Sequence, residues 1–358
     1  MKICIWQHRP SLHQLALIEA LNKKCELIWI IENERLNSLR LNMGWNNDCS
    51  IDYYLISNYN DMVTFVETLD SSTVHLFGGI RASNNLSILI KYLINKKRRV
   101  YIQSEASDYF GIKGKLRVLR GVYDNRKIIK KIEGVFAIGS LGVKFYKMIG
   151  VETTKIFPWG YFVKKTNFKL ENESNVFQII FVGRLIKTKG VEVLLKSLKY
   201  IKNDYYLTII GNGVEEDVIK KMINNDSRLR KNVTLINALP NEEVIREIAK
   251  SDLLVLPSVY KEGWGAVVSE ALMQGTRVIA SDKCGSSVLL SNSLRGAVVK
   301  SGSIESLREE LVKQIMQGKV SEATRNKIID WSKCISGEVA AQYMLDCIKY
   351  KKPEVPWL

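Results

Sequence analysis

The sequence is poor in the features that build metal centres, cross-links and membrane spans. Its three histidines have no zinc-type spacing, its six cysteines include no Cys-x-x-Cys pair, and no Asp-x-Asp motif occurs. We therefore expect no metal site, and reduced thiols in place of disulfides. No apolar run reaches the roughly 20 residues that a membrane-spanning helix needs, and no signal-peptide pattern follows Met1, so we expect a cytoplasmic protein.

Positive charge is in excess and is unevenly distributed. The 358 residues carry a formal net charge of +16, and residues 1–165 hold 25 Lys and Arg against 14 Asp and Glu. Eight cations fall within Lys113–Lys131, which contains a single acid, Asp124. Such a cluster attracts a phosphorylated ligand, an anionic bilayer or a nucleic acid, although a solvated basic surface explains it equally well.

Short apolar runs alternate with helical patterns along the chain, which is typical of doubly wound α/β folds with parallel sheets. The alternation is interrupted by the polar, aperiodic stretch Lys164–Asn175, which we interpret as a linker. We therefore predict two Rossmann-like domains, 1–165 and 173–336, facing each other across a cleft. The C-terminal helix, within 337–358, is expected to pack back on the first domain.

The strongest local signal is the pair Glu262 and Glu270, which follows the predicted strand Leu253–Leu256. Two glycines precede the next predicted helix, whose free N–H groups would favour an anion. That helix is apolar nearly all round, so Glu270 should be buried, and a buried carboxylate without a partner is costly. Its oxygens suit a vicinal diol such as a ribose, although a structural arginine or backbone amides would also satisfy them.

A second signal lies in the loop after the predicted strand Val176–Val182. Arg184 and Lys189 flank this loop and could neutralise a diphosphate, although such cations are often merely solvated. A third strand ends in Gly211-Asn212-Gly213, a tight turn that lacks the third glycine of a dinucleotide fingerprint. We expect this turn to line the same cleft.

The order of these elements resembles family 4 of the retaining glycosyltransferases with a GT-B fold. The resemblance covers Val176–Leu290 and rests on strand-Gly-Arg-x4-Lys-Gly, strand-Gly-x-Gly, Pro-Ser and Glu-x7-Glu. It implies a nucleoside-diphosphate sugar as donor and no further cofactor. Arg184 and Lys189 would then bind the diphosphate, Glu270 the ribose hydroxyls and Glu262 the transferred sugar.

The resemblance also implies further donor contacts. The backbone near sugar and phosphate would come from Gly183, Gly263, Trp264, Gly265 and Ala266, with Gly211 and Gly213 alongside. The nucleobase would lie against Asn237 and Leu239, which flank Ala238 where the family often has glycine. In the first domain the family often places a histidine after the strand that corresponds to Arg99–Gln103. This chain has Glu105 nearby, a candidate replacement at the reaction centre or a partner for the basic cluster.

Taken together, the patterns and the resemblance predict a metal-independent hexosyltransferase in surface polysaccharide or glycolipid assembly, and the resemblance implies that it acts with retention. Its acceptor would be a glycan or lipid-linked glycan, and Lys113–Lys131 would face an anionic membrane, which places the protein peripherally on the inner face of the cell membrane. One alternative is a sugar-nucleotide epimerase or hydrolase on the same fold. The other is a non-enzymatic basic protein for membrane or nucleic acid, but the chain lacks a nucleic-acid module signature, so no nucleic-acid partner is expected.

Overall fold

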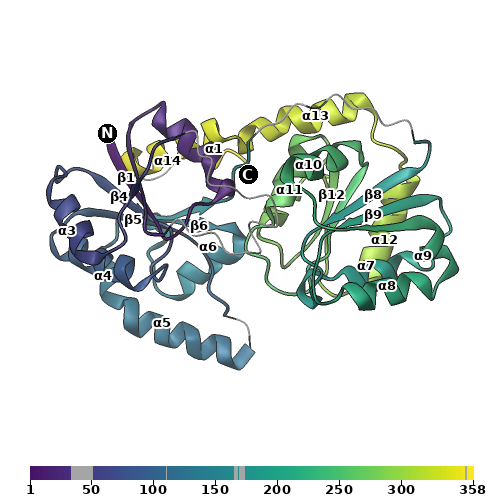
Figure 1. Cartoon of the computed structure of the whole chain (residues 1–358), viewed down its shortest axis with the longest axis horizontal. Coiled ribbons are helices and arrows are strands. Elements are labelled where there is room, and N and C mark those ends of the chain that lie inside the picture. The colour runs from purple at the N-terminus through teal and green to yellow at the C-terminus, as the bar shows by residue number, and fades with distance from the viewer. Residues whose placement is uncertain (34–50, 110, 165–167, 169–173, 351–352) are drawn as a thin grey trace. The chain divides into compact units, whose positions relative to one another are not determined.

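The computed structural model describes residues 1–33, 51–109, 111–164, 168, 174–350 and 353–358 (Figure 1). The described residues form two compact units. Unit 1 holds those of 1–164 together with those of 336–356, and unit 2 holds those of 168–335 with Trp357 and Leu358. Most of the predicted linker, and Cys49, lie outside the described residues.

Unit 1 is built on a seven-stranded, wholly parallel sheet in the order β3-β2-β1-β4-β5-β6-β7. Strand β1 lies next to β2 on one side and β4 on the other, so Trp6 is aligned with Ile30 and with Phe77. Its buried strands are nearly continuous apolar runs because helices cover both faces. The strands are β1 Lys2–Gln7, β2 Glu26–Ile31, β3 Tyr54–Leu55, β4 Val74–Phe77, β5 Arg99–Glu105, β6 Gly134–Ile138 and β7 Ile156–Trp159.

The helices of unit 1 fall into two layers (Figure 1). Helices α1 and α14 pack against each other, and α4 contacts both α3 and α5. The contact of α14 is close: a Cβ at Gly337 would lie 2.3 Å from the carbonyl oxygen of Ala16. The helices are α1 Leu12–Asn22, α3 Tyr59–Glu67, α4 Asn84–Asn95, α5 Gly111–Lys131, α6 Gly139–Met148 and α14 Gly337–Tyr350.

Unit 2 contains a six-stranded parallel sheet in the order β10-β9-β8-β11-β12-β13. Its strands are β8 Phe177–Val182, β9 Tyr205–Ile210, β10 Val233–Ile236, β11 Leu253–Leu256, β12 Arg277–Ser281 and β13 Gly296–Val299. Its helices are α7 Val191–Leu198, α8 Glu216–Asn224, α9 Ser227–Asn232, α10 Asn241–Lys250, α11 Ala266–Met273, α12 Ile304–Met316 and α13 Glu322–Ser332. Helices α7 and α12 contact each other, as do α10 and α11, and the two pairs lie on opposite faces of the sheet (Figure 1).

The predicted class, two α/β domains with parallel sheets, is confirmed. The sequence-based expectation did not include the short edge strand β3, helix α9, strand β13 or helix α13. The basic segment Lys113–Lys131 is also more than a charge cluster, because it forms most of the 21-residue helix α5. No helix of the described chain is long and apolar enough to cross a bilayer.

Candidate active site

The predicted donor residues surround the topological switch point of unit 2. Strands β8 and β11 are neighbours in the sheet but not in sequence, so their connections run in opposite directions along the sheet. In open parallel sheets the crevice outside the carboxyl ends of such strands is the usual ligand site. Arg184 and Lys189 follow β8, and Glu262 follows β11. The two motifs found in the sequence therefore start at one edge of one sheet.

A cavity of about 540 Å³ opens at this edge. Both Arg184 and Glu270 line it, and so does the turn Gly211-Asn212-Gly213, as expected from the sequence. Its wall is largely apolar, as small-molecule sites are, with few polar groups. The sequence analysis missed the apolar members, which carry no motif and are recognisable only once the loops are folded. The lining residues are Val182, Gly183, Arg184, Ile186, Ile210, Gly211, Asn212, Gly213, Val214, Ala238, Leu239, Asn241, Val244 and Glu270.

An ion pair joins the two charged motifs. The Lys189 ammonium donates a hydrogen bond to the Glu262 carboxylate, and both side chains are mostly buried. Ser258 Oγ lies 3.4 Å from Glu262 Oε2. The pair adjoins the cavity, because Lys189 Cδ lies 4.0 Å from the Cβ position of the lining residue Gly183. Arg184, in contrast, is exposed and forms no ion pair within the described part of the chain. It is a cation of the cavity wall that is available to an anionic ligand.

Glu270 is a buried carboxylate that faces this cavity. Its residue is 8% exposed, and no hydrogen bond or ion pair of its side chain is found among the described residues. Neither the structural arginine nor the backbone amides considered as its partners are present there. Burial alone raises the pKa of Glu270 to about 7, since desolvation penalises the charged form. Such an unsatisfied acceptor at a cavity wall marks a place where a hydroxyl-bearing ligand would bind.

Two glycines allow the loops to approach this closely. Gly265 precedes α11 with a φ of 82°, and a Cβ there would lie 2.7 Å from the Leu256 side chain and 2.9 Å from Cys284 Sγ. A Cβ at Gly211 would lie 1.9 Å from the carbonyl oxygen of Gly183. A side chain at Gly211 would push apart the loops that follow β8 and β9, and one at Gly265 would overlap with the end of β11 and the loop that follows β12. Because these two positions have no side chain, the neighbouring loops can pack closely around the cavity.

We expect Gly265→Ala to destabilise unit 2 and to deform the site. A left-handed φ costs a non-glycine residue about 1–2 kcal/mol, and the overlaps with Leu256 and Cys284 should add about 1–3 kcal/mol. Gly302→Ala is the matched control, because its φ of 72° is similar but nothing lies within 4 Å of the added Cβ. Urea unfolding should show the larger loss for Gly265→Ala, and equal losses would contradict the crowding.

Trp264 and Asn237, two of the predicted donor residues, are not among the residues that line the cavity. The side chain of Trp264 is 1% exposed and donates to Ser269 Oγ at 3.0 Å, so only its backbone is available to a ligand. Asn237 is not among the lining residues, whereas its neighbours Ala238 and Leu239 are. Asn212 Oδ1 accepts a 2.8 Å hydrogen bond from the backbone N–H of Ala238, which fixes this wall. Val214, Asn241 and Val244 complete the side of the cavity where a nucleobase was expected.

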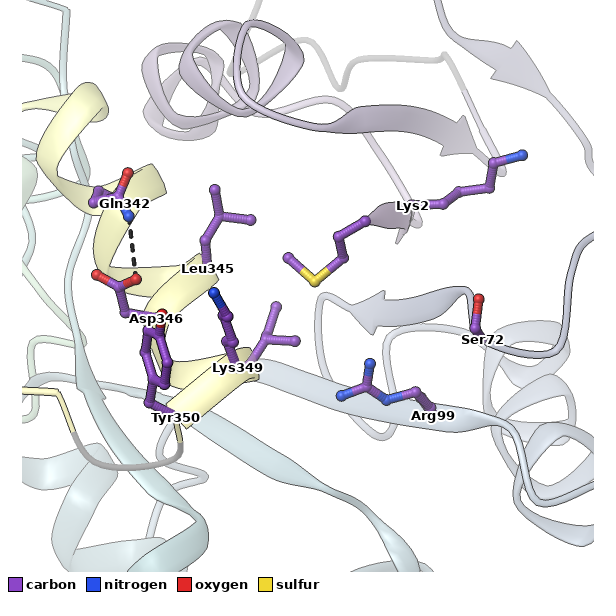
Figure 2. Close-up of a pocket in the computed structure, with 10 residues that line it drawn as sticks. Lys2, Ser72, Arg99, Gln342, Leu345, Asp346, Lys349 and Tyr350 are labelled. Carbon is purple, nitrogen blue, oxygen red and sulfur yellow. Dashed lines mark hydrogen bonds between the residues drawn. The ribbon is translucent and has the colours of Figure 1, made fainter.

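A larger cavity, of about 710 Å³, lies in unit 1 between α14 and the amino ends of β1 and β5 (Figure 2). Two of its cations are already neutralised: Lys2 pairs with Glu26 at 2.6 Å and Arg99 with Glu133 at 3.0 Å. On the α14 side of the cavity, Gln342 donates a hydrogen bond to Asp346 one turn further along the helix (Figure 2). It lies at the edge of the sheet opposite to the one that parallel sheets use for ligands, so we do not assign it as the active site.

The carboxyl edge of unit 1 carries a polar group that the sequence analysis did not single out. The buried carboxylate of Glu32, just after β2, shares a 2.8 Å hydrogen bond with His8 Nδ1 and accepts another from Asn85 at 3.0 Å. Glu105 ends β5, and the Tyr161 hydroxyl donates to it at 2.7 Å. No ion pair joins Glu105 to a described cation of the basic cluster Lys113–Lys131. The sequence signal that could have identified these residues is a polar side chain at or directly after the carboxyl end of a strand.

The two units are the pair of Rossmann-like domains that make up the GT-B fold. Residues 163–331 match the family described as Glycosyl transferases group 1. Solved GT-B structures agree over the whole chain: HepE of Anabaena in complex with UDP has a TM-score of 0.76 at 14% identity and covers 98% of this chain and 100% of its own. The lipopolysaccharide outer core galactosyltransferase WaaB has a TM-score of 0.72 at 14% identity, with the same coverage.

Curated relatives match the chain in part. The amylovoran biosynthesis glycosyltransferase AmsK of Erwinia amylovora is 28% identical over 159 residues, which are 42% of this chain and 39% of AmsK. A Campylobacter jejuni enzyme named as an N-acetylgalactosaminyltransferase acting on a diphospho-undecaprenol glycan is 28% identical over 173 residues, 48% of this chain and 46% of that enzyme. The chain thus spans less than half the length of these relatives.

Proposed function

We propose that the protein is a glycosyltransferase that moves a hexose-type sugar from a nucleoside-diphosphate sugar to an acceptor hydroxyl. The observation that carries this proposal is the cavity of unit 2. It places the unpaired cation Arg184 and the unpartnered carboxylate Glu270 in one wall, beside the Lys189–Glu262 pair. A phosphate and a hydroxyl-rich ligand would satisfy these groups together, which a nucleoside-diphosphate sugar does in a single molecule.

Each donor residue has a role that follows from its chemistry. Arg184 contacts the diphosphate, and Glu270 accepts hydrogen bonds from the ribose hydroxyls. The base lies against Ala238, Leu239 and Val244, on the apolar side of the cavity. Lys189 is shared between the phosphate and Glu262, which leaves a Glu262 oxygen for a sugar hydroxyl. The backbone before α11, from Gly263 to Ala266, adds N–H groups at a helix N-terminus.

We propose further that transfer proceeds with retention and that Arg184 and Lys189 supply the positive charge that other transferases draw from a divalent cation. The bond between the anomeric carbon and the diphosphate breaks, and the acceptor oxygen attacks from the same face. The departing diphosphate takes the acceptor's proton. The enzyme's main contribution is then electrostatic, because fixed cations stabilise the charge that grows on the leaving group.

The acceptor is assigned to unit 1, whose carboxyl edge holds Glu105, Tyr161 and the His8–Glu32 pair. These groups can accept and donate hydrogen bonds to sugar hydroxyls, and Glu105 is the candidate for contact at the reaction centre. A glycan or lipid-linked glycan in surface polysaccharide or glycolipid assembly is the acceptor class we favour. The named roles of AmsK and of the Campylobacter jejuni enzyme support this choice.

A thermal-shift panel of UDP, GDP, ADP and dTDP tests the donor assignment. Ligand at about 100 times its Kd stabilises by about 2.7 kcal/mol, which corresponds to roughly 5–10 °C for a unit of this size. We expect one nucleotide to raise Tm and its sugar conjugates to do so as well. If none of the four shifts Tm at millimolar concentration, the cavity does not bind a nucleoside diphosphate and the proposal fails.

A further inference from the structure

Helix α5 presents an apolar stripe to solvent. Four large apolar side chains are more exposed than buried: Ile112 at 81%, Leu116 at 61%, Leu119 at 66% and Tyr123 at 85%. Their spacing of four, three and four residues puts them within about 60° of the helix circumference. The stripe is therefore one continuous face, which differs from the scattered single exposures that are normal on a surface.

A different face of the same helix is already used for packing. Val118 and Val122 pack against the core of unit 1, and Ile128 and Ile129 belong to it. At 100° per residue these positions lie about 90–150° around the helix from the centre of the stripe. The apolar stripe cannot be a misaligned core face, because the core face is occupied by other residues. Ile112, Leu116, Leu119 and Tyr123 have an outward role.

Cations continue the line of the stripe. Arg126, Lys127 and Lys130 follow it along the same side of α5 and are exposed, and Lys115 borders it. None of these four forms an ion pair within the described residues. The stripe from Ile112 to Tyr123 is roughly 16 Å long, about half of a bilayer's hydrocarbon thickness, so α5 cannot cross a membrane. An apolar face flanked by lysine and arginine is what a helix lying in the headgroup region of an anionic bilayer requires.

We propose that α5 docks the protein onto anionic lipid bilayers, with Ile112, Leu116, Leu119 and Tyr123 inserted among the acyl chains. Arg126, Lys127 and Lys130 contact lipid phosphates. The inference stands apart from the proposed transfer reaction, because it rests on exposed side chains of α5 and not on the donor cavity of unit 2. Vesicle binding can therefore fail while UDP binding succeeds, or the reverse.

Sedimentation with vesicles tests this surface. The full chain should bind vesicles of phosphatidylglycerol and phosphatidylcholine more tightly than pure phosphatidylcholine, and less tightly at high salt. The double variant Leu116→Gln and Leu119→Gln should lower the partition coefficient by about a hundredfold or more, because two leucine side chains no longer leave water. The control Met316→Gln replaces a side chain of unit 2 that is 72% exposed, and it should bind as the parent does.

A second set of variants tests the basic residues of α5. Lys127→Glu with Lys130→Glu should weaken binding to phosphatidylglycerol vesicles by about thirtyfold or more, whereas Lys202→Glu with Lys231→Glu, exposed in unit 2, should leave it within about threefold. All variants should keep the parent Tm. The proposal is overturned if the parent chain does not bind anionic vesicles, or if the leucine variant sediments with them as the parent does. The proposal is also overturned if the parent chain is a dimer and the leucine variant is a monomer, since the stripe would then join two copies of the chain.

Discussion

Arg184→Ala should abolish most of the turnover while leaving the protein folded. Removing one group that stabilises charge in a transition state typically lowers the rate by about 10²–10³. Arg184 is exposed and unpaired within the described residues, so its loss breaks no internal contact and Tm should stay unchanged. Release of nucleotide from the donor sugar, followed in the presence of acceptor glycan, gives the rate. The matched control is Lys187→Ala, an exposed cation of the same loop that does not line the cavity.

Binding separates this role from a general effect of charge. UDP should bind Arg184→Ala about 10 to 100 times more weakly by calorimetry, since hydrogen bonds to charged groups are worth about 1.5–3 kcal/mol. Uridine, which has no phosphate, should bind both proteins alike. Lys187→Ala should match the parent with both ligands. Full turnover in Arg184→Ala, or an equal loss for uridine and UDP, would show that Arg184 does not hold the diphosphate.

Glu270→Gln should stabilise the ligand-free protein at pH 8 and weaken its nucleotide binding. The folded-state pKa of about 7 lies above the unfolded value near 4.3, so the folded state binds the proton more tightly. This contribution is fully present below about pH 4.3 and is lost as pH rises through 7. The shift corresponds to about 3 kcal/mol at pH 8, an upper limit on what the glutamine recovers. Urea unfolding at pH 5 and pH 8 should show the gain mainly at pH 8.

The same substitution should reduce affinity for uridine and UDP alike, by about tenfold or more, because both carry the ribose hydroxyls. In the parent, hydroxyls that donate to Glu270 favour its ionised form, so binding releases a proton and affinity should rise with pH up to about 7. Glu270→Gln should lose this pH dependence. Glu309→Gln, on the exposed side of α12, serves as control. An affinity that does not depend on pH in the parent would contradict a ligand contact at Glu270.

Much of unit 2 could be predicted from the sequence because its signals are local. The burial of Glu270 followed from the apolar residues around it on α11, and the shared edge of Arg184 and Glu262 followed from strands that end just before them. The Lys189–Glu262 pair could not be foreseen, since it depends on how two loops 73 residues apart fold against each other. The same holds for Val214 and Val244, whose place in the cavity wall depends on the order of β8, β9 and β10.

Unit 1 was harder to predict for physical reasons that α5 and Glu32 illustrate. In α5 the outward stripe and the inward valines are both apolar, and basic residues lie between them, so the usual one-sided periodicity is lost. Glu32 follows a buried strand, as many acidic residues in loops do, so its position in the sequence does not set it apart. Only its contacts with His8 and Asn85, which come from distant segments, distinguish it.

The return of the C-terminal helix to α1 means that most of unit 2 is inserted between the two segments of unit 1. Apart from Trp357 and Leu358, the described residues of unit 2 come from the single piece 168–335, whereas unit 1 needs both ends of the chain. A chain cut after Ile335 would leave bare the surface of α1 on which α14 rests, and we expect it to aggregate. A fragment of residues 168–335 lacks only Trp357 and Leu358 of the described residues of unit 2, so we expect it to fold and to be a suitable sample for testing nucleotide binding by NMR.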